Sequence, residues 1–289
     1  MIELTINKHT YRVPSRWDEC DAATFRRLAR AMWNFEMGHT DFETFRIEIV
    51  AACLGMDIPS TRLTDFLGVN FFTLGELLTF PYTLHDNDDG TQTAFVEVVM
   101  QNNLYPFIED AEGYRYETDA NGVIDTTLNA IQYTSGISLL NLQASYIRNY
   151  REDLALQLLD TFVRLMYNGR SIVNIDDRIA VMYNFRGITE SIRRDASYDL
   201  IFRKKGQKSE PSPVGSNAGL FALTKAGYGD YDAVSKMDVH TFLSAMVQQT
   251  VDSIHSLQGA GMKPGKIAEK LNLDVEQVLP FTTVSAEEE

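Results

Sequence analysis

The chain has 289 residues, of which 44% are hydrophobic and 23% charged, and its net charge is −14 with a pI of about 4.8. A chain of this length and composition buries a sizeable core, as ordinary globular proteins do. The negative charge argues against non-specific attraction to nucleic acid or to anionic membranes. No window approaches about 18 uninterrupted apolar residues, and the opening MIELTINKHT has no secretory signal pattern. We therefore expect a cytoplasmic protein with no membrane span.

The N-terminal third predicts a hairpin followed by helices. Residues 2–13 alternate apolar and polar side chains around NKHT, which indicates a β-hairpin closed by Pro14. Asp21 is placed to cap a helix that carries Phe25 and Leu28 on one face. The stretch Thr40-Asp-Phe-Glu43 predicts a capping box with Thr40 as the N-cap, and Thr73-Leu-Gly-Glu76 predicts a second one before a short helix.

Residues 80–133 have a different character. Three turn signals (DNDDG, EDAEG and TDANG) separate short runs rich in Val, Tyr, Phe and Thr, which predicts a small β-rich insertion. Eleven Asp and Glu residues lie between Glu76 and Asp125, against Arg115 as the only basic residue. We expect this acidic segment to be largely solvated.

Helical periodicity returns over 137–167 and 176–202. The stretch from Arg203 to Gly219 is polar and rich in Pro, Gly and Ser, which predicts a linker or mobile loop. Asp238 is placed to cap a long helix with a broad apolar stripe, a pattern typical of core packing. The sequence therefore predicts a mainly α-helical protein, most simply one compact body. Its parts are an N-terminal hairpin with helices (1–79), an acidic β-rich insertion (80–133), central helices (134–202), a flexible loop (203–219) and C-terminal helices (220–289).

The stretch GMKPGKIAEKLNLDVEQVLPF, residues 261–281, has the outline of a helix–turn–helix. In such a motif the second helix reads the major groove, and its flanks contact phosphates through cations. Here the second helix offers Asp274 and Glu276 and no cation, and Pro280 ends it. We expect a helical hairpin that packs on protein, and no sequence-specific binding of nucleic acid.

Basic residues form the candidate interaction surface. Between Arg186 and Lys208 the cations exceed the carboxylates, which fits contact with nucleic acid, with the acidic insertion or with an acidic partner, and equally a solvated face. A second basic group lies at the start of the helical hairpin. The candidate residues are Arg203, Lys204, Lys205, Lys208, Lys263, Lys266 and Lys270.

The sequence contains no catalytic, cofactor or metal motif. HDNDDG, residues 85–90, resembles a calcium loop, but one register misplaces the glycine and the other lacks the required carboxylates. We therefore predict a hairpin turn there. The five histidines lack zinc-ligand spacing, and no GxSxG, phosphate-binding loop or dinucleotide fingerprint occurs. Cys20 and Cys53 are expected to be buried free thiols. We predict no cofactor, no metal and no catalytic residue.

The N-terminal stretch carries one family resemblance. LTINKHTYRVPSRWDECDAATFRRLARAM resembles the opening of small proteins from the tail-gene region of tailed phages and prophages of Bacteroidetes hosts, over roughly the first fifty-five residues. The segment from Gly227 to Met246 is loosely similar to late segments of phage tail-assembly proteins. The matching positions of the opening are Ile6, Tyr11, Val13, Pro14, Ser15, Trp17, Asp18, Glu19, Phe25 and Leu28.

The resemblance implies a non-enzymatic protein that binds other proteins in tail assembly or structure. It also implies tail components as partners, and a location in the host cytoplasm or in the virion. The β-rich insertion departs from the pattern of a short assembly chaperone. The alternative hypothesis is an enzyme or regulator with a carboxylate-lined site near residues 80–133.

Overall fold

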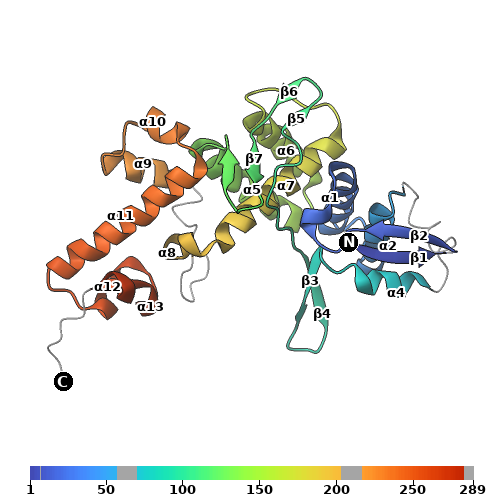
Figure 1. The fold of residues 1–289 in the computed structure, drawn as a ribbon, viewed down its shortest axis with the longest axis horizontal. Coiled ribbons are helices and arrows are strands. Elements are labelled where there is room, and N and C mark those ends of the chain that lie inside the picture. Colours follow the sequence, from blue (N-terminus) through green and yellow to red (C-terminus); the bar gives the residue numbers. More distant parts are fainter. Residues whose placement is uncertain (7, 57–69, 203–216, 283–289) are drawn as a thin grey trace. The chain divides into compact units, whose positions relative to one another are not determined.

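The computed structural model describes residues 1–6, 8–56, 70–202 and 217–282 (Figure 1). Within these ranges the protein is mainly helical, with strands confined to the N-terminal hairpin and to residues 82–126, as predicted. Contacts divide the chain into two units: residues 1–125 with 139–190, and residues 126–138 with 191–289. Two of the boundaries in the chain fall inside helices, in α5 (Ala130–Arg148) and α7 (Ile175–Arg194).

The first unit opens with the predicted hairpin. Strands β1 (Ile2–Ile6) and β2 (His9–Val13) pair antiparallel, with Leu4 opposite Tyr11. Helix α1 (Ala22–Glu36) begins where predicted, because an Asp21 carboxyl oxygen accepts a hydrogen bond from the Thr24 amide at 2.7 Å. Leu4, Val13, Phe25 and Leu28 are buried. The alternation and the capping residue therefore predicted both elements correctly.

Both predicted capping boxes are wrong. Helix α2 (Phe42–Cys53) is capped by Asp41, whose side chain accepts from the Thr44 amide at 2.8 Å. The carboxylate one residue later thus replaces the Thr40 hydroxyl. Thr73 lies inside helix α4 (Asn70–Leu77), where its backbone is helical, so it cannot stand before the helix as a cap.

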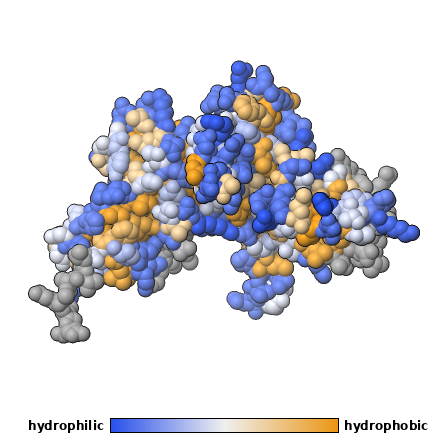
Figure 2. Space-filling model, in the orientation of Figure 1, coloured by the Kyte–Doolittle hydropathy of each residue, from blue (hydrophilic) through white to orange (hydrophobic). Residues whose placement is uncertain are grey.

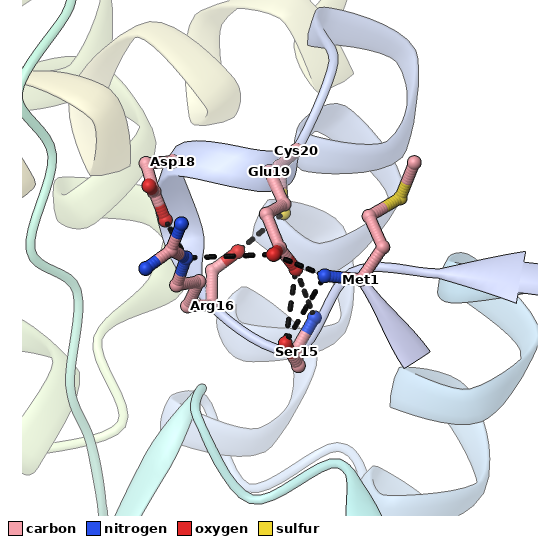
Figure 3. Close-up of polar contacts among 6 residues, drawn as sticks. All are labelled: Met1, Ser15, Arg16, Asp18, Glu19 and Cys20. Carbon is pink, nitrogen blue, oxygen red and sulfur yellow. Dashed lines mark hydrogen bonds and ion pairs between the residues drawn. The ribbon is translucent and has the colours of Figure 1, made fainter. Parts of the chain in front are cut away.

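A polar cluster surrounds the short 3₁₀ helix η1 (Trp17–Glu19) (Figure 3). The Glu19 carboxylate accepts hydrogen bonds from the Ser15 amide (2.8 Å) and hydroxyl (2.9 Å). The N-terminal ammonium of Met1 contacts the same carboxylate, and Arg16 Nε lies 3.4 Å from it. The Met1 ammonium first, and then the Ser15 amide and hydroxyl, lower the pKa of Glu19 to about 2. The cluster ties the start of β1 to the turn that precedes α1.

The cluster makes a pH-dependent contribution to stability that can be measured. Because the folded-state pKa of Glu19 lies below its unfolded value of 4.5, its contribution is complete above pH 4.5 and is lost as the pH falls toward 2. We expect Glu19→Gln to lower the melting temperature at pH 7, and the difference from wild type to shrink between pH 4.5 and 2. Asp18→Asn is the matched control, since Asp18 pairs with the exposed Arg16. A difference for Glu19→Gln that is constant with pH would contradict this assignment.

Residues 80–133 form three short antiparallel pairs. These are β3 (Tyr82–Asp86) with β4 (Gln92–Val96), β5 (Phe107–Ile108) with β6 (Ala111–Glu112), and β7 (Tyr116–Thr118) with β8 (Ile124–Thr126). The acidic residues are exposed as expected, apart from the half-buried Glu97. Several apolar and aromatic side chains of the same segment are buried in the core of the first unit. They are Val98, Met100, Tyr105, Ile108, Tyr114 and Tyr116.

Helix α7 holds the segment that follows β4. The amide of Met100 donates to the Gly187 carbonyl at 3.0 Å, and the buried Asn184 side chain bonds to the backbone of Asn102 and Leu104. The Tyr105 hydroxyl donates to the Ala22 carbonyl at 2.6 Å, at the start of α1. Residues 98–105, which we call the strap, are therefore fixed to two helices by backbone and side-chain hydrogen bonds.

The central helices complete the first unit. Helix α6 (Glu152–Met166) buries Phe162 and Met166 as predicted, whereas Leu154 and Leu158 are half-buried beside the buried Ala155 and Leu159. Arg186 of α7 donates to Glu36 of α1 at 2.8 and 3.1 Å and to the Val96 carbonyl at 3.1 Å. Both cysteines are buried free thiols, and Cys20 lies just before α1.

The second unit is built on the long helix α11 (Val239–Gly259). As predicted, Asp238 caps it by accepting from the His240 and Thr241 amides at 3.1 and 3.0 Å. The short helices α9 (Ala218–Lys225) and α10 (Tyr231–Lys236) precede it, so the predicted linker ends before Ala218. The remainder of that linker, residues 203–216, lies outside the described residues.

The helix–turn–helix outline is confirmed as a local structure. It consists of α12 (Pro264–Leu271), a left-handed turn at Asn272, α13 (Val275–Val278) and η4 (Leu279–Phe281). Leu273 and Val278 pack in a core with Val251 and Ile254 of α11. Leu200 of α8 (Asp199–Phe202) belongs to the same core. The Gln277 side chain donates a hydrogen bond to the Asp199 carbonyl of that helix. Figure 2 shows hydrophobic residues gathered over α11 and the α12–α13 segment.

Two apolar residues of this hairpin stay exposed: Val275 at 39% and Leu279 at 43%. The packing prediction is therefore confirmed for Leu273 and Val278, while the absence of sequence-specific DNA binding stays a prediction. Within the described ranges, none of the helices is both long and apolar enough to cross a membrane.

Candidate functional site

The predicted basic surface is only partly described. Arg203, Lys204, Lys205 and Lys208 lie outside the described residues. Lys263, Lys266 and Lys270 are exposed at the N-cap and on the outer face of α12, and Lys266 pairs with Glu269 at 2.8 Å. Lys270 also lines a hollow of about 650 Å³ together with Tyr228 and Asp252. The structure thus brings the three lysines onto one short helix.

The β3–β4 hairpin exposes two large apolar side chains. Leu84 is 46% exposed and Phe95 is 51% exposed. Because Leu84 pairs with Ala94 and Thr83 pairs with Phe95, the two apolar side chains lie on opposite faces of the ribbon. Figure 1 shows β3 and β4 extending away from the helices of their unit. Both faces of the hairpin therefore present apolar surface to solvent.

The turn of this hairpin is the HDNDDG stretch, and the predicted hairpin turn is confirmed. The Asn87 amide donates to the Thr91 carbonyl at 2.8 Å. Asp89 accepts from the Thr91 amide and hydroxyl, and Asp86 accepts from the Gln92 side chain. No group of His, Cys, Asp and Glu in the described ranges has the arrangement of a metal site.

We therefore expect millimolar calcium to leave the melting temperature of the protein unchanged. The Asp86 and Asp89 carboxylates already accept hydrogen bonds from the hairpin itself, and the loop lacks the ligand positions of a calcium loop. Thermal unfolding in calcium and in magnesium at equal ionic strength is the measurement. A rise of several degrees in calcium alone, lost in Asp89→Asn, would show that the turn binds the ion.

A second feature is a pocket of about 470 Å³ in the first unit. The pocket is lined by Arg26 and Arg27 on one turn of α1 and by Arg30 on the next, and Asp176 at the start of α7 also lines it. Asp176 lies 4.0 Å from Arg26 Nη2 and 3.3 Å from Arg30 Nη1, so one carboxylate bridges two guanidiniums. We call this cavity the arginine pocket.

The rest of the arginine pocket is formed by α1 and α2. Its apolar wall consists of Ala23, Ala31, Ala51, Ala52 and Met56, and its remaining polar residues are Asn34 and Glu48. Burial raises the pKa of Glu48 to about 6, against the opposing effects of the hydrogen bond with Asn34 and the charge of Arg30. Glu48 Oε2 is buried and has no hydrogen-bond partner among the described residues. The pocket therefore combines cations, a carboxyl group that titrates close to neutrality, and small apolar side chains.

Sequence reasoning missed the arginine pocket. The available signal was the stretch FRRLARA, residues 25–31, where three arginines fall within two turns of a helix whose other face is apolar. The chain positions of Glu48 and Asp176 gave no indication that both face these arginines. The alternative carboxylate-lined site near residues 80–133 has no counterpart in either pocket, because neither is lined by that segment.

Comparison with protein-family models, with curated proteins and with solved structures finds no match.

Proposed function

We propose that the protein acts without catalysis, by binding another protein in the assembly or structure of a phage or prophage tail. The observation that carries the proposal is the β3–β4 hairpin, which exposes Leu84 and Phe95 on its two faces. The tail context rests on the resemblance of the first fifty-five residues to tail-gene-region proteins. This role implies a location in the cytoplasm of the host cell or in the virion.

The physics of a two-stranded ribbon supports a docking role. An isolated hairpin is marginally stable in water, and apolar residues on an uncovered face gain free energy when a partner removes them from solvent. Tyr82 and Val96 are buried at the base of the hairpin and anchor it to the unit. We expect the partner to have an apolar groove that receives the ribbon.

The charge of the hairpin tip restricts the kind of partner further. Asp86, Asp88 and Asp89 are exposed at the tip, and no Lys or Arg occurs between Glu76 and Arg115. Opposite charges steer association and suppress wrong partners. We therefore expect the groove of the partner to carry basic residues where it meets the acidic tip of the hairpin.

The experiment is complementation in a phage whose genome encodes this chain. Leu84→Thr and Phe95→Thr together keep strand propensity while removing the exposed apolar surface. Each buried apolar anchor of an interface contributes more than about 1 kcal/mol, so the double variant is expected to weaken partner binding by roughly 10- to 100-fold. Tailed particles counted by electron microscopy should fall accordingly, while the melting temperature of the isolated protein stays within a few degrees.

Phe107→Thr is the matched control, because Phe107 is an exposed aromatic residue of another strand in the same unit. It should leave tail formation unchanged. Co-expression with each tail protein of the same phage then identifies the partner by co-elution in size-exclusion chromatography. Normal tails in a phage that lacks the chain altogether would contradict the tail role, and normal tails with the hairpin variant would contradict the hairpin as its docking element.

A further inference from the structure

We infer that the outer edge of β4 is a pairing site for an extended segment of the partner protein, with basic residues at the end of that segment that lies beside the hairpin tip. The inference rests on the proposed function, because it describes how the partner binds the β3–β4 hairpin. The segment adds a third strand beside β4 through backbone hydrogen bonds, which is a common way for proteins to recognise extended peptides.

The register of the hairpin leaves backbone groups of β4 open. In an antiparallel ribbon, pairs of opposite residues that hydrogen-bond to each other alternate with pairs whose N–H and C=O groups point outward. The amide of Asn87 donates to the Thr91 carbonyl at 2.8 Å, so these two residues form a hydrogen-bonded pair. The next pair toward the base, which contains Gln92, therefore points outward, and so does the pair that contains Ala94.

Contacts at the base of the hairpin agree with this alternation and mark the end of the open edge. The Glu97 amide donates to the Pro81 carbonyl at 3.0 Å, which is again a hydrogen-bonded pair. The carbonyl of the neighbouring Val96 points outward and accepts from Arg186 at 3.1 Å. Within the described ranges, the outward backbone groups of the two residues named above have no hydrogen-bond partner. The edge therefore offers one N–H and one C=O on each of two residues, and it ends at Val96.

The composition of β4 distinguishes it from the other strands of its length. Edge strands of natural proteins commonly carry charged residues or proline, which prevent pairing with other chains. In the described part of the chain, the five-residue strands β1, β2 and β3 carry Glu3, Arg12 and Asp86, whereas β4 (QTAFV) has neither a charge nor a proline. The hairpin also extends away from the helices of its unit (Figure 1). The edge of β4 is therefore both unprotected and accessible.

A third strand stabilises the hairpin in two ways. A two-stranded ribbon is marginally stable in water, and three or more strands are needed for a sheet that is stable by itself. Side chains on the same face of neighbouring strands contact each other, so a partner residue beside Phe95 covers part of its exposed ring. One extended segment thus satisfies the open backbone groups and removes apolar surface from water.

Charge sets the direction of the segment. The exposed Asp86, Asp88 and Asp89 lie at the tip, and β4 runs from the tip to the base. Antiparallel pairing is slightly more stable than parallel pairing, so the C-terminal end of the partner segment lies beside the tip. Lys or Arg at that end is attracted by the carboxylates. A second copy of this chain, with its net charge of −14, is repelled and is not the occupant that the charges favour.

The test is NMR measurement of amide exchange with water in the full chain, with and without a capped seven-residue peptide. The peptide alternates Thr and Val and ends in two lysines. We expect half-saturation at or below about 1 mM, and at about 5 mM peptide the amides of Gln92 and Ala94 should exchange at least about threefold more slowly. The amides of Leu84 and Asp86, on the edge of β3, should be unchanged. Absence of protection on β4, or protection on β3 instead, would overturn the inference.

The peptide with the reversed sequence tests the charge argument. It has the same composition, but antiparallel pairing places its two lysines at the base of the hairpin. It should therefore bind several-fold more weakly than the first peptide. Equal binding of the two peptides would overturn the placement of basic residues beside the tip.

Ala94→Pro tests the edge itself, and Ala94→Val is its matched control. Proline removes the outward N–H of residue 94 without removing a hydrogen bond between β3 and β4, and valine has a similar volume but keeps the N–H. The proline variant should bind the peptide about tenfold more weakly, and the valine variant should bind as the wild type does. Equal affinities of the two variants would overturn the backbone pairing. The exchange pattern of the wild-type chain decides the question even where proline disturbs the hairpin.

The outcomes separate this inference from the proposed function. Normal tails in a phage that lacks the chain would contradict the tail role and leave the peptide result unaffected. Loss of tails in the Leu84→Thr, Phe95→Thr variant, together with no protection of Gln92 and Ala94 by the peptide, would support docking through the faces of the hairpin and overturn pairing at its edge.

Discussion

Gly187→Val is expected to destabilise the first unit by about 3 kcal/mol, and Gly187→Ala by about 1 to 2 kcal/mol. A methyl group on residue 187 would lie 2.5 Å from Met100 Cγ and 2.8 Å from Val98 Cγ1. Both side chains are buried and cannot move aside without disturbing the strap. Alanine gains about 1 kcal/mol of helix propensity over glycine, which offsets only part of the steric cost. Urea unfolding, followed by circular dichroism, measures the difference.

Gly265→Ala is the matched control for this prediction. Gly265 is also helical, in α12, but a methyl group added there would meet no atom within 4 Å. This variant is expected to be neutral or slightly stabilising. Combining Gly187→Ala with Met100→Ala should cost less than the sum of the two single changes, because the shortened Met100 makes room for the methyl group. Strict additivity would mean that residues 187 and 100 do not compete for the same space.

The features that could be predicted from the sequence are those that depend on residues close together along the chain. The β1–β2 hairpin follows from alternation over twelve residues, and the starts of α1 and α11 follow from Asp21 and Asp238, whose carboxyl groups accept from amides two or three residues ahead. The cap of α2 was misplaced by one residue because Thr40 and Asp41 are both good N-caps. Local patterns identify such an end without deciding between adjacent capping residues.

The candidate sites depend on contacts that no local pattern contains. Arg30 and Asp176 are separated by 146 residues, yet they lie 3.3 Å apart in the arginine pocket. The burial of Tyr105, Tyr114 and Tyr116 was also not predicted, since residues 98–116 have neither a helical nor an alternating period that indicates a buried face. The turns of this segment were therefore recognisable from the sequence, and its packing against α7 was not.

Asn184→Ala is expected to destabilise the first unit by about 2 to 4 kcal/mol, a large effect for the loss of one polar side chain. The Asn184 side chain is fully buried; its oxygen accepts from the Leu104 amide at 3.0 Å, and its nitrogen donates to the Asn102 carbonyl at 3.1 Å. Alanine leaves both backbone groups of the strap without this partner and also opens a cavity. The mutation costs more than two average hydrogen bonds because the orphaned groups lose their partner without regaining full contact with water.

Asn149→Ala is the matched control for this second prediction, and hydrogen exchange of the strap is its most direct measurement. Asn149 donates a side-chain hydrogen bond to the Ser145 carbonyl at 2.7 Å, but it is exposed, so water replaces the lost bond and the cost should stay below about 1 kcal/mol. In Asn184→Ala, the amide of Leu104 should exchange at least tenfold faster than in the wild type, since it has lost its acceptor. Unchanged protection of this amide would show that the strap is held by its other contacts, the Met100 amide with Gly187 and the Tyr105 hydroxyl with Ala22.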